Sequence, residues 1–161
     1  MKLSALYQIF LDCQSVTTDS RNCPDGSLFI ALKGESFNGN AFAKLALDSG
    51  CAFAIIDEIQ YAIEGDQRYI LVDDCLQTMQ QLANYHRRQL GTRVIGITGT
   101  NGKTTTKELI SSVLCQAHNV LYTLGNLNNH IGVPTTLLRL KPEHDLAVIE
   151  MGANHPYQLP T

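Results

Sequence analysis

The chain has 161 residues, of which 44% are hydrophobic, and a formal net charge of −3 at pH 7. This length predicts one globular domain or two small ones, and no apolar run is long enough to favour a membrane span. The slightly acidic charge balance argues against a nucleic-acid-binding protein, which would carry a basic patch. Five cysteines without a Cys-x-x-Cys pair predict reduced thiols in a cytoplasmic protein, and Gln8 and Asp12 interrupt the N-terminal apolar stretch, so no secretory signal is expected.

Apolar runs separated by turn residues predict a small α/β unit in the first part of the chain. Leu3, Leu6, Tyr7 and Phe10 share one face of an expected amphipathic helix. The predicted elements are a helix over 2–11, a strand beginning at 16, a strand over 27–32, a polar loop over 33–40, a helix over 41–47, and strands over 51–56 and 69–72.

A longer helix is expected after Asp73 and Asp74, which can cap its N-terminus, and Gly91 can end it. We expect this helix to join two domains, residues 1–90 and 91–161. Near its end His86, Arg87 and Arg88 favour a solvated helix terminus over a ligand site.

The segment around residues 99–104 carries the clearest functional signal. An apolar run over 93–98 predicts a buried strand, and residues 107–114 have helical spacing that extends to about 116. Between them Gly99 and Gly102 allow the backbone to expose N–H groups toward phosphate, Lys103 supplies a positive charge, and Thr104 offers a hydroxyl to Mg²⁺. The usual pattern has glycine where this chain has Ile97, so a glycine-rich turn with a lysine by chance is the alternative.

The remaining elements complete an expected parallel sheet that is covered on both faces. They are a strand over 120–123, a polar loop over 125–130, a helix over 136–139 and a strand over 145–150. Ligands of such sheets bind at the carboxyl ends of the strands. Glu150 lies there and could share a magnesium ion with Thr104; the alternative is an exposed strand-end glutamate without contacts.

Several of these segments resemble the Mur ligases, ATP-dependent enzymes of bacterial peptidoglycan synthesis that form amide bonds on UDP-N-acetylmuramoyl peptides. Residues 99–104 resemble the family's own variant of the phosphate loop, and residues 18–21 and 26–34 resemble its uridine-nucleotide-binding N-terminal domain. Residues 125–138 and 150–155 resemble the branch that adds D-alanyl-D-alanine to the tripeptide precursor. The branch that adds the third residue to the dipeptide precursor is the close alternative.

The resemblance implies an α/β fold, with a small UDP-substrate-binding domain and linker helix over 1–90 and the first part of a P-loop, parallel-sheet ATPase domain over 91–161. It implies that ATP is bound by Gly99, Thr100, Asn101, Gly102, Lys103, Thr104 and Thr105, and that magnesium is bound by Thr104 and Glu150. The catalytic residues that it implies are Lys103, Asn128, Asn129 and Glu150. The substrate contacts that it implies come from Ser20, Asn40, Ala41 and Phe42. Residue 40 is often histidine in the family. Asn128 and Asn129 could instead satisfy loop backbone, and His155 could lie near the site or cap a helix.

The implied reaction forms an acyl phosphate from ATP and UDP-N-acetylmuramoyl-tripeptide, and D-alanyl-D-alanine then displaces phosphate. The expected partners are these two substrates, without nucleic acid or membrane, and a monomeric full-length enzyme. Because the family's proteins are much longer, we expect this chain to be an N-terminal fragment that is inactive by itself, or a non-catalytic UDP-sugar-binding module. A small P-loop kinase or GTPase is disfavoured, because about ninety residues precede the loop.

Overall fold

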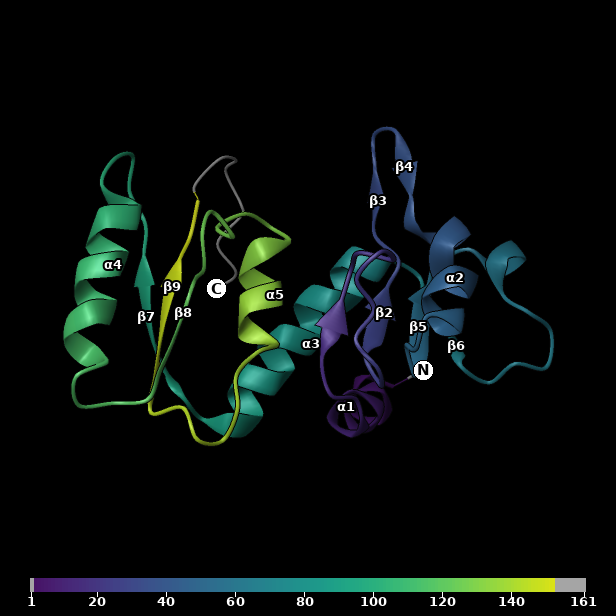
Figure 1. Cartoon of the computed structure of the whole chain (residues 1–161), viewed down its shortest axis with the longest axis horizontal. Coiled ribbons are helices and arrows are strands. Elements are labelled where there is room, and N and C mark those ends of the chain that lie inside the picture. The colour runs from purple at the N-terminus through teal and green to yellow at the C-terminus, as the bar shows by residue number, and fades with distance from the viewer. Residues whose placement is uncertain (1, 153–161) are drawn as a thin grey trace. The chain divides into compact units, whose positions relative to one another are not determined.

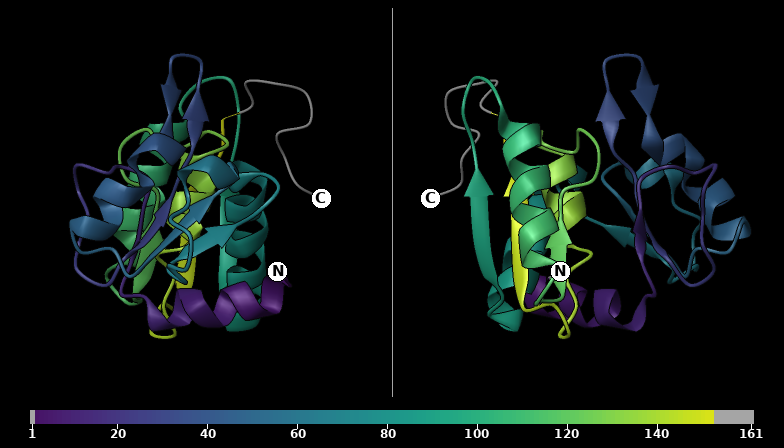
Figure 2. Two further views of the ribbon diagram at one scale, coloured as in Figure 1. Left: turned by 90° about the vertical axis from the view of Figure 1, so that its right-hand side faces the viewer. Right: turned by 60° about the vertical axis from the view of Figure 1, so that its left-hand side comes forward.

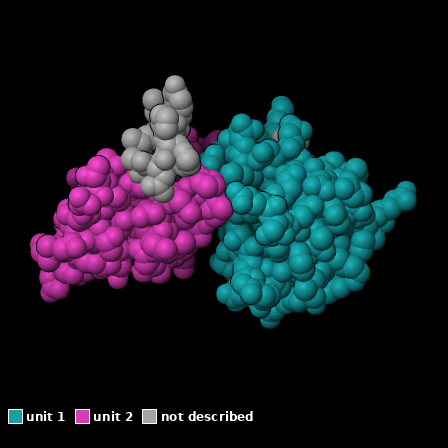
Figure 3. Space-filling view, turned by 90° about the horizontal axis from the view of Figure 1, so that it is seen from above, with its two compact units in different colours: residues 1–82 teal, residues 83–161 magenta. Residues whose placement is uncertain are grey.

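The computed structural model describes residues 2–152. The chain divides into two compact units, residues 1–82 and 83–161, and each is described by itself (Figures 1 and 3). The division falls inside one long helix, α3 (Cys75–Leu90). The predicted boundary at residue 90 stays a prediction.

The first unit is built on a four-stranded parallel sheet with the order β1-β2-β5-β6. Its central strands are apolar because both of their faces are covered, as is typical of parallel sheets; Leu28, Phe29 and Ile30 of β2 are wholly buried. Helix α1 buries Leu6 and Phe10, as its predicted apolar face requires. The elements are α1 (Leu3–Asp12), β1 (Val16–Thr17), β2 (Leu28–Ile30), a 3-10 turn (Gly39–Phe42), α2 (Ala43–Asp48), β5 (Phe53–Ile56), a 3-10 turn (Ile59–Tyr61) and β6 (Tyr69–Leu71).

The polar loop predicted over residues 33–40 is wrong in part, because it contains a short hairpin. Strands β3 (Lys33–Gly34) and β4 (Phe37–Asn38) pair antiparallel and project from the unit (Figures 1 and 2). Lys33, Gly34 and Phe37 are exposed, so no alternation of apolar and polar residues marks these strands. The two-residue connection closes the hairpin locally.

Helix α3 begins and ends as the sequence predicts. The Asp74 Oδ1 atom accepts a hydrogen bond of 2.7 Å from the Gln77 backbone N–H, and the chain leaves the helix at Gly91 with φ +66°. The solvated helix end is wrong for His86. This side chain is only 4% exposed, its Nε2 atom lies 2.9 Å from the Leu140 carbonyl oxygen, and burial lowers its pKa.

The second unit has a three-stranded parallel sheet with the order β7-β9-β8. One face packs against α4 through Ile110 and Leu114, and the other carries α5, whose Leu137 packs against a second apolar cluster. Both faces of the sheet are therefore covered, as predicted (Figure 2). The elements are β7 (Arg93–Ile97), α4 (Lys103–Leu114), β8 (Val120–Tyr122), α5 (Gly132–Leu137) and β9 (Leu146–Glu150).

Two details of this unit differ from the predictions. Strand β9 is the central strand and is buried throughout, whereas β7 lies at the edge and only its Ile97 is buried, so the predicted burial of residues 93–98 is wrong. Helix α5 starts at Gly132, earlier than predicted, and includes Pro134 in its first turn, where proline is tolerated because no intrahelical N–H bond is required there.

Candidate functional site

The turn between β7 and α4 has the backbone geometry that the sequence predicts. Gly102 precedes α4 with φ +75° and Gly99 has φ +144°, conformations that side chains other than glycine rarely adopt. The first helical hydrogen bond runs from the Thr106 N–H to the Gly102 carbonyl oxygen at 2.9 Å, and no side chain within residues 2–152 caps the helix. The N–H groups of the first turn of α4 are therefore available to an anion, as at other helix N-termini.

A pocket of about 310 Å³ lies over this turn. Its lining residues come from the turn, from α4, from the loop after β8 and from the end of β9: Thr100, Asn101, Gly102, Lys103, Thr104, Thr105, Asn128 and Glu150. The structure thus brings together eight of the ten predicted nucleotide, metal and catalytic residues. Of the other two, Gly99 accepts a 2.6 Å hydrogen bond from the Lys103 Nζ atom at its carbonyl oxygen, and Asn129 lies elsewhere in the loop.

Glu150 is the most constrained side chain of the pocket. It is 1% exposed, so the alternative of an exposed strand-end glutamate without contacts is wrong. Its Oε1 atom accepts hydrogen bonds from the Thr104 hydroxyl at 3.2 Å and from the Asn128 Nδ2 atom at 2.8 Å. Its Oε2 atom is buried and has no hydrogen-bond partner among the described residues. A buried carboxylate oxygen without a partner is costly unless a proton donor or a cation completes it.

The donors around Glu150 suit magnesium better than a metal held by protein ligands alone. Within residues 2–152 no three His, Cys, Asp or Glu side chains group together as a metal centre. Mg²⁺ in nucleotide-binding proteins is commonly held by one or two protein oxygens together with phosphates. The Thr104 hydroxyl and the unpartnered Glu150 oxygen fit that pattern.

The two neighbouring asparagines of the loop after β8 differ in their contacts. Asn128 points its amide at Glu150, and its carbonyl oxygen accepts from the Gly152 N–H at 2.6 Å. Asn129 instead caps α5, since its Oδ1 atom accepts from the N–H groups of Ile131 and Gly132 at 3.1 and 2.7 Å. These contacts of Asn129 correspond to the alternative that it satisfies loop backbone, and its catalytic role stays a prediction. His155 lies outside the described residues.

In the first unit, Ser20 occupies a turn just after β1. The turn is held by Asp19, whose carboxylate binds the Arg21 guanidinium at 2.8 Å, and the hydrogen bonds from Arg21 lower the Asp19 pKa to about 2. The Thr17 hydroxyl donates to the Asn22 carbonyl oxygen at 2.9 Å across the same turn. These bonds hold the backbone on both sides of Ser20, whose own side chain is buried.

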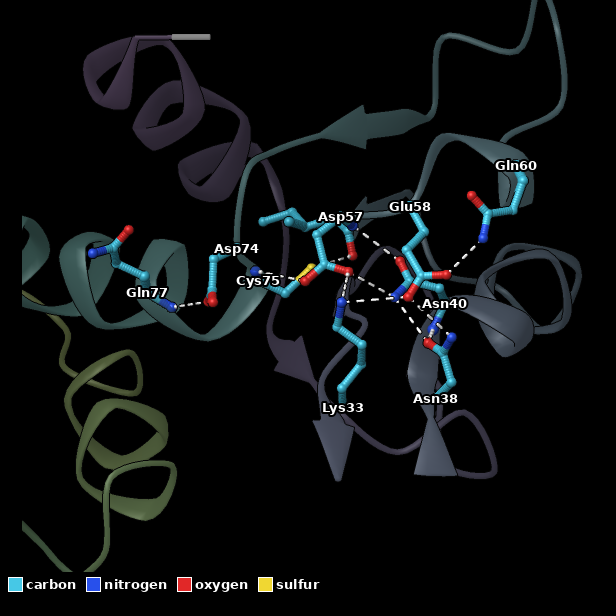
Figure 4. Close-up of polar contacts among 10 residues, drawn as sticks. Lys33, Asn38, Asn40, Asp57, Glu58, Gln60, Asp74, Cys75 and Gln77 are labelled. Atoms are coloured by element: carbon cyan, nitrogen blue, oxygen red, sulfur yellow. Dashed lines mark hydrogen bonds and ion pairs between the residues drawn. The ribbon is translucent and has the colours of Figure 1, made fainter. Parts of the chain in front are cut away.

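Asn40 does not present its side chain to a ligand. It is 1% exposed, and its Nδ2 atom donates to Asp57 Oδ1 at 2.8 Å and to Asn38 Oδ1 at 2.9 Å, while its Oδ1 atom accepts from the Asp57 N–H at 2.9 Å (Figure 4). The predicted substrate contact through the Asn40 side chain is not supported by this geometry. The neighbouring Ala41 and Phe42 are exposed, and the Phe42 ring stacks on Phe37 with centroids 5.2 Å apart.

Asp57 is the centre of this polar network, and no motif of the sequence predicted a role for it. Its carboxylate also pairs with Lys33 at 3.0 Å and accepts from the Cys75 N–H at the start of α3 at 3.2 Å (Figure 4). Burial alone would raise the Asp57 pKa, but the hydrogen bonds from Asn40 and Lys33 lower it. The available signal was an aspartate directly after a buried strand, at the edge of the sheet where binding residues gather.

Comparison with protein families gives two adjoining matches. Residues 12–87 match the model described as the Mur ligase family catalytic domain, and residues 97–160 match the Mur ligase middle domain. This chain belongs to the Mur ligase family. The resemblance to the Mur ligases that residues 18–21, 26–34 and 99–104 indicate is thereby confirmed.

Several curated relatives of this Mur ligase chain bear the name of one branch. The UDP-N-acetylmuramoyl-tripeptide–D-alanyl-D-alanine ligase of Escherichia coli (strain K12) is 46% identical over 141 residues, which are 88% of this chain and 30% of that protein. The ligase of the same name from Bacillus subtilis (strain 168) is 47% identical over 137 residues, 85% of this chain and 30% of that protein. The chain thus spans about 30% of the length of these relatives.

Solved structures of the branch that the sequence predicted superpose on this chain. A MurF crystal structure from Acinetobacter baumannii superposes with a TM-score of 0.84 and 37% identity, covering 98% of this chain and 37% of that one. The MurF ligase from Thermotoga maritima in complex with ADP has a TM-score of 0.80 and 31% identity, and the match covers 91% of this chain and 34% of that one. The mixed α/β fold with parallel sheets is confirmed. No helix formed by residues 2–152 is long and apolar enough to cross a membrane.

Proposed function

We propose that this chain carries the nucleotide-binding and UDP-substrate-binding parts of a MurF-type ligase. The observation that supports this most directly is the buried Glu150 Oε2 atom beside the phosphate loop, which has no hydrogen-bond partner within residues 2–152. In the proposal residues 99–105 would bind the phosphates of ATP, and Thr104 and Glu150 would hold Mg²⁺. The ion would neutralise charge on the phosphates when it is bound.

The side chains of the pocket suit the transfer of a phosphoryl group. Lys103 and the N–H groups at the start of α4 stabilise the negative charge that spreads over the γ-phosphate. Asn128 holds Glu150 in place through its amide. No nucleophilic side chain of the pocket has to react, because the substrate carboxylate is itself the nucleophile.

The proposed reaction of the whole ligase has two balanced steps. An oxygen of the tripeptide carboxylate of UDP-N-acetylmuramoyl-tripeptide attacks the γ-phosphorus, and ADP leaves with the electrons of the broken P–O bond. The amine of D-alanyl-D-alanine then attacks the acyl carbon, loses a proton and displaces phosphate. We propose that this takes place in the cytoplasm, where ATP and reduced thiols occur together, and that the full-length ligase is a monomer.

The first unit would recognise the uridine nucleotide of the substrate. Ser20 is held in a tied turn, and the exposed face of the Phe37–Phe42 pair offers an aromatic surface to a base.

A ligase that adds the third residue to the dipeptide precursor is the alternative within the family. We also propose that the 161 residues bind their ligands without turnover, and a UDP-sugar-binding module without nucleotide binding is the rival.

Calorimetric titration of the chain tests the proposal. We expect binding of Mg-ATP and, separately, of UDP-N-acetylmuramoyl-tripeptide in preference to the dipeptide precursor. Ser20→Ala should weaken only the UDP-peptide, and Lys103→Met should weaken only ATP. Binding of the UDP-peptide without ATP would favour the UDP-sugar-binding module, and a preference for the dipeptide precursor would favour the other branch. Steady release of phosphate from ATP by the chain alone would contradict the proposed lack of turnover.

A further inference from the structure

Lys107 is a charged side chain in a place where charge is rare. It lies on α4 three residues after Thr104 and is wholly buried, on the helix face whose Ile110 and Leu114 pack against the sheet. Lysine is almost never fully buried unless it is paired. Its Nζ atom donates to the Thr123 carbonyl oxygen at 2.8 Å and lies 2.7 Å from Glu108 Oε1.

The bond to Thr123 interrupts the sheet at the point where the pocket begins. In a parallel ladder, a residue that donates its N–H to one residue of the neighbouring strand accepts from the residue two further on. The Thr123 N–H donates to the Val148 carbonyl oxygen at 3.0 Å, so the Thr123 carbonyl oxygen should accept from the Glu150 N–H. That carbonyl oxygen is bound by Lys107 instead.

The Thr123 hydroxyl accepts the hydrogen bond that the Thr123 carbonyl oxygen would accept in a regular ladder. Its Oγ1 atom accepts from the Glu150 N–H at 2.9 Å, and Thr123 is wholly buried. Glu150 is therefore held at its backbone by Thr123 and at its carboxylate by Thr104 and Asn128. The ladder between β8 and β9 thus ends in a side-chain contact at the residue that carries the carboxylate.

We propose that Lys107 is a positioning residue for the magnesium site. By holding the Thr123 carbonyl oxygen it keeps the ladder open, and the Thr123 hydroxyl then fixes Glu150 so that its unpartnered oxygen faces the ion. This rests on the proposed function, since it assigns Glu150 to magnesium. Groups that hold a metal ligand in place typically change metal affinity about 10–100-fold when they are replaced.

The test compares the affinity of the full chain for ADP with and without Mg²⁺. Lys107→Met keeps the length of the side chain without the charge, Thr123→Val keeps its shape without the hydroxyl, and Thr123→Ser is the matched control that retains the hydroxyl. In Lys107→Met and Thr123→Val we expect the gain in ADP affinity on adding Mg²⁺ to fall about tenfold, with metal-free ADP affinity unchanged. Thr123→Ser should keep the full gain.

A ligand-free measurement separates this inference from the proposed function. Amide hydrogen exchange should show the Glu150 N–H at least about tenfold less protected in Thr123→Val than in Thr123→Ser, because the valine offers no acceptor. Equal Glu150 protection in these two variants would overturn the inference even if the chain bound no nucleotide. An undiminished magnesium gain in Lys107→Met, or an equal loss of metal-free affinity in a folded variant, would overturn it as well. Failure of the wild-type chain to bind Mg-ADP would count against the proposed function alone.

Discussion

Replacing Asp57 with asparagine should destabilise the first unit substantially. The Asp57 side chain is 5% exposed and accepts from the Asn40 amide, the Lys33 ammonium and the Cys75 N–H. The asparagine side chain would be isosteric, but it lacks the charge and turns one acceptor into a donor that faces other donors. Net contributions of hydrogen bonds to charged groups are about 1.5–3 kcal/mol each and are not additive. With Lys33 discounted because its side chain is half exposed, we expect a loss of about 2 kcal/mol.

The destabilisation caused by Asp57→Asn should be larger at neutral pH than in acid. The folded-state pKa of Asp57 is lowered, so its stabilisation is present above the unfolded-state pKa of about 3.9 and is lost as the pH falls through the folded-state value. The difference in free energy of unfolding between wild type and Asp57→Asn should therefore be complete at neutral pH and shrink in acid.

Urea unfolding followed by circular dichroism, at neutral pH and at acid pH, measures this difference. Asp48→Asn is the matched control, because Asp48 forms an exposed pair with Lys44 on the surface of α2 and such pairs contribute little. A loss below about 0.5 kcal/mol at neutral pH, well short of the contribution of one charged hydrogen bond, would refute the reasoning. A loss that stayed the same in acid would refute it too.

Three further outcomes are expected. Lys103→Met should lower the affinity of the chain for ADP at least about tenfold by calorimetry, because it removes the charge that faces the phosphates; unchanged affinity would exclude this role. Glu150→Gln should abolish the gain in ADP affinity on adding Mg²⁺ and leave metal-free affinity unaltered; a retained gain would place the ion elsewhere. Since β7 is an edge strand with Ile95 37% exposed, the chain should self-associate in light scattering, and Ile95→Lys should reduce this; a clean monomer at all concentrations would contradict it.

The strands buried on both faces could be predicted from the sequence. The runs over 28–30, 53–56 and 146–149 are apolar without alternation, as two-sided burial requires. The run over 93–97 looks the same, yet it forms the edge strand. Its exposure could not be predicted, because the order of strands in a sheet is not encoded in the composition of any one strand.

For the candidate site too, some features could be predicted from the sequence and others could not. The phosphate loop and Glu150 could be predicted, since glycine spacing and the end of a strand are local features. The contacts of Asn40 and Lys107 could not, because their partners Asp57 and Thr123 are 17 and 16 residues away in the chain. The burial of Lys107 has one local indication in the sequence. Lys107 lies three and seven residues before Ile110 and Leu114, a spacing that puts the lysine on an apolar helix face.

The reciprocal bonding of Asn40 has a consequence for how this protein can vary. Its amide makes three hydrogen bonds, two as donor and one as acceptor. A neutral histidine at this position would have one donor and one acceptor. It cannot replace all three bonds, so either the Asp57 carboxylate or the Asn38 side chain would lose a donor. Residues 38, 40 and 57 should therefore be inherited as a matched set, and exchanging residue 40 between relatives should succeed only when its two partners are exchanged with it.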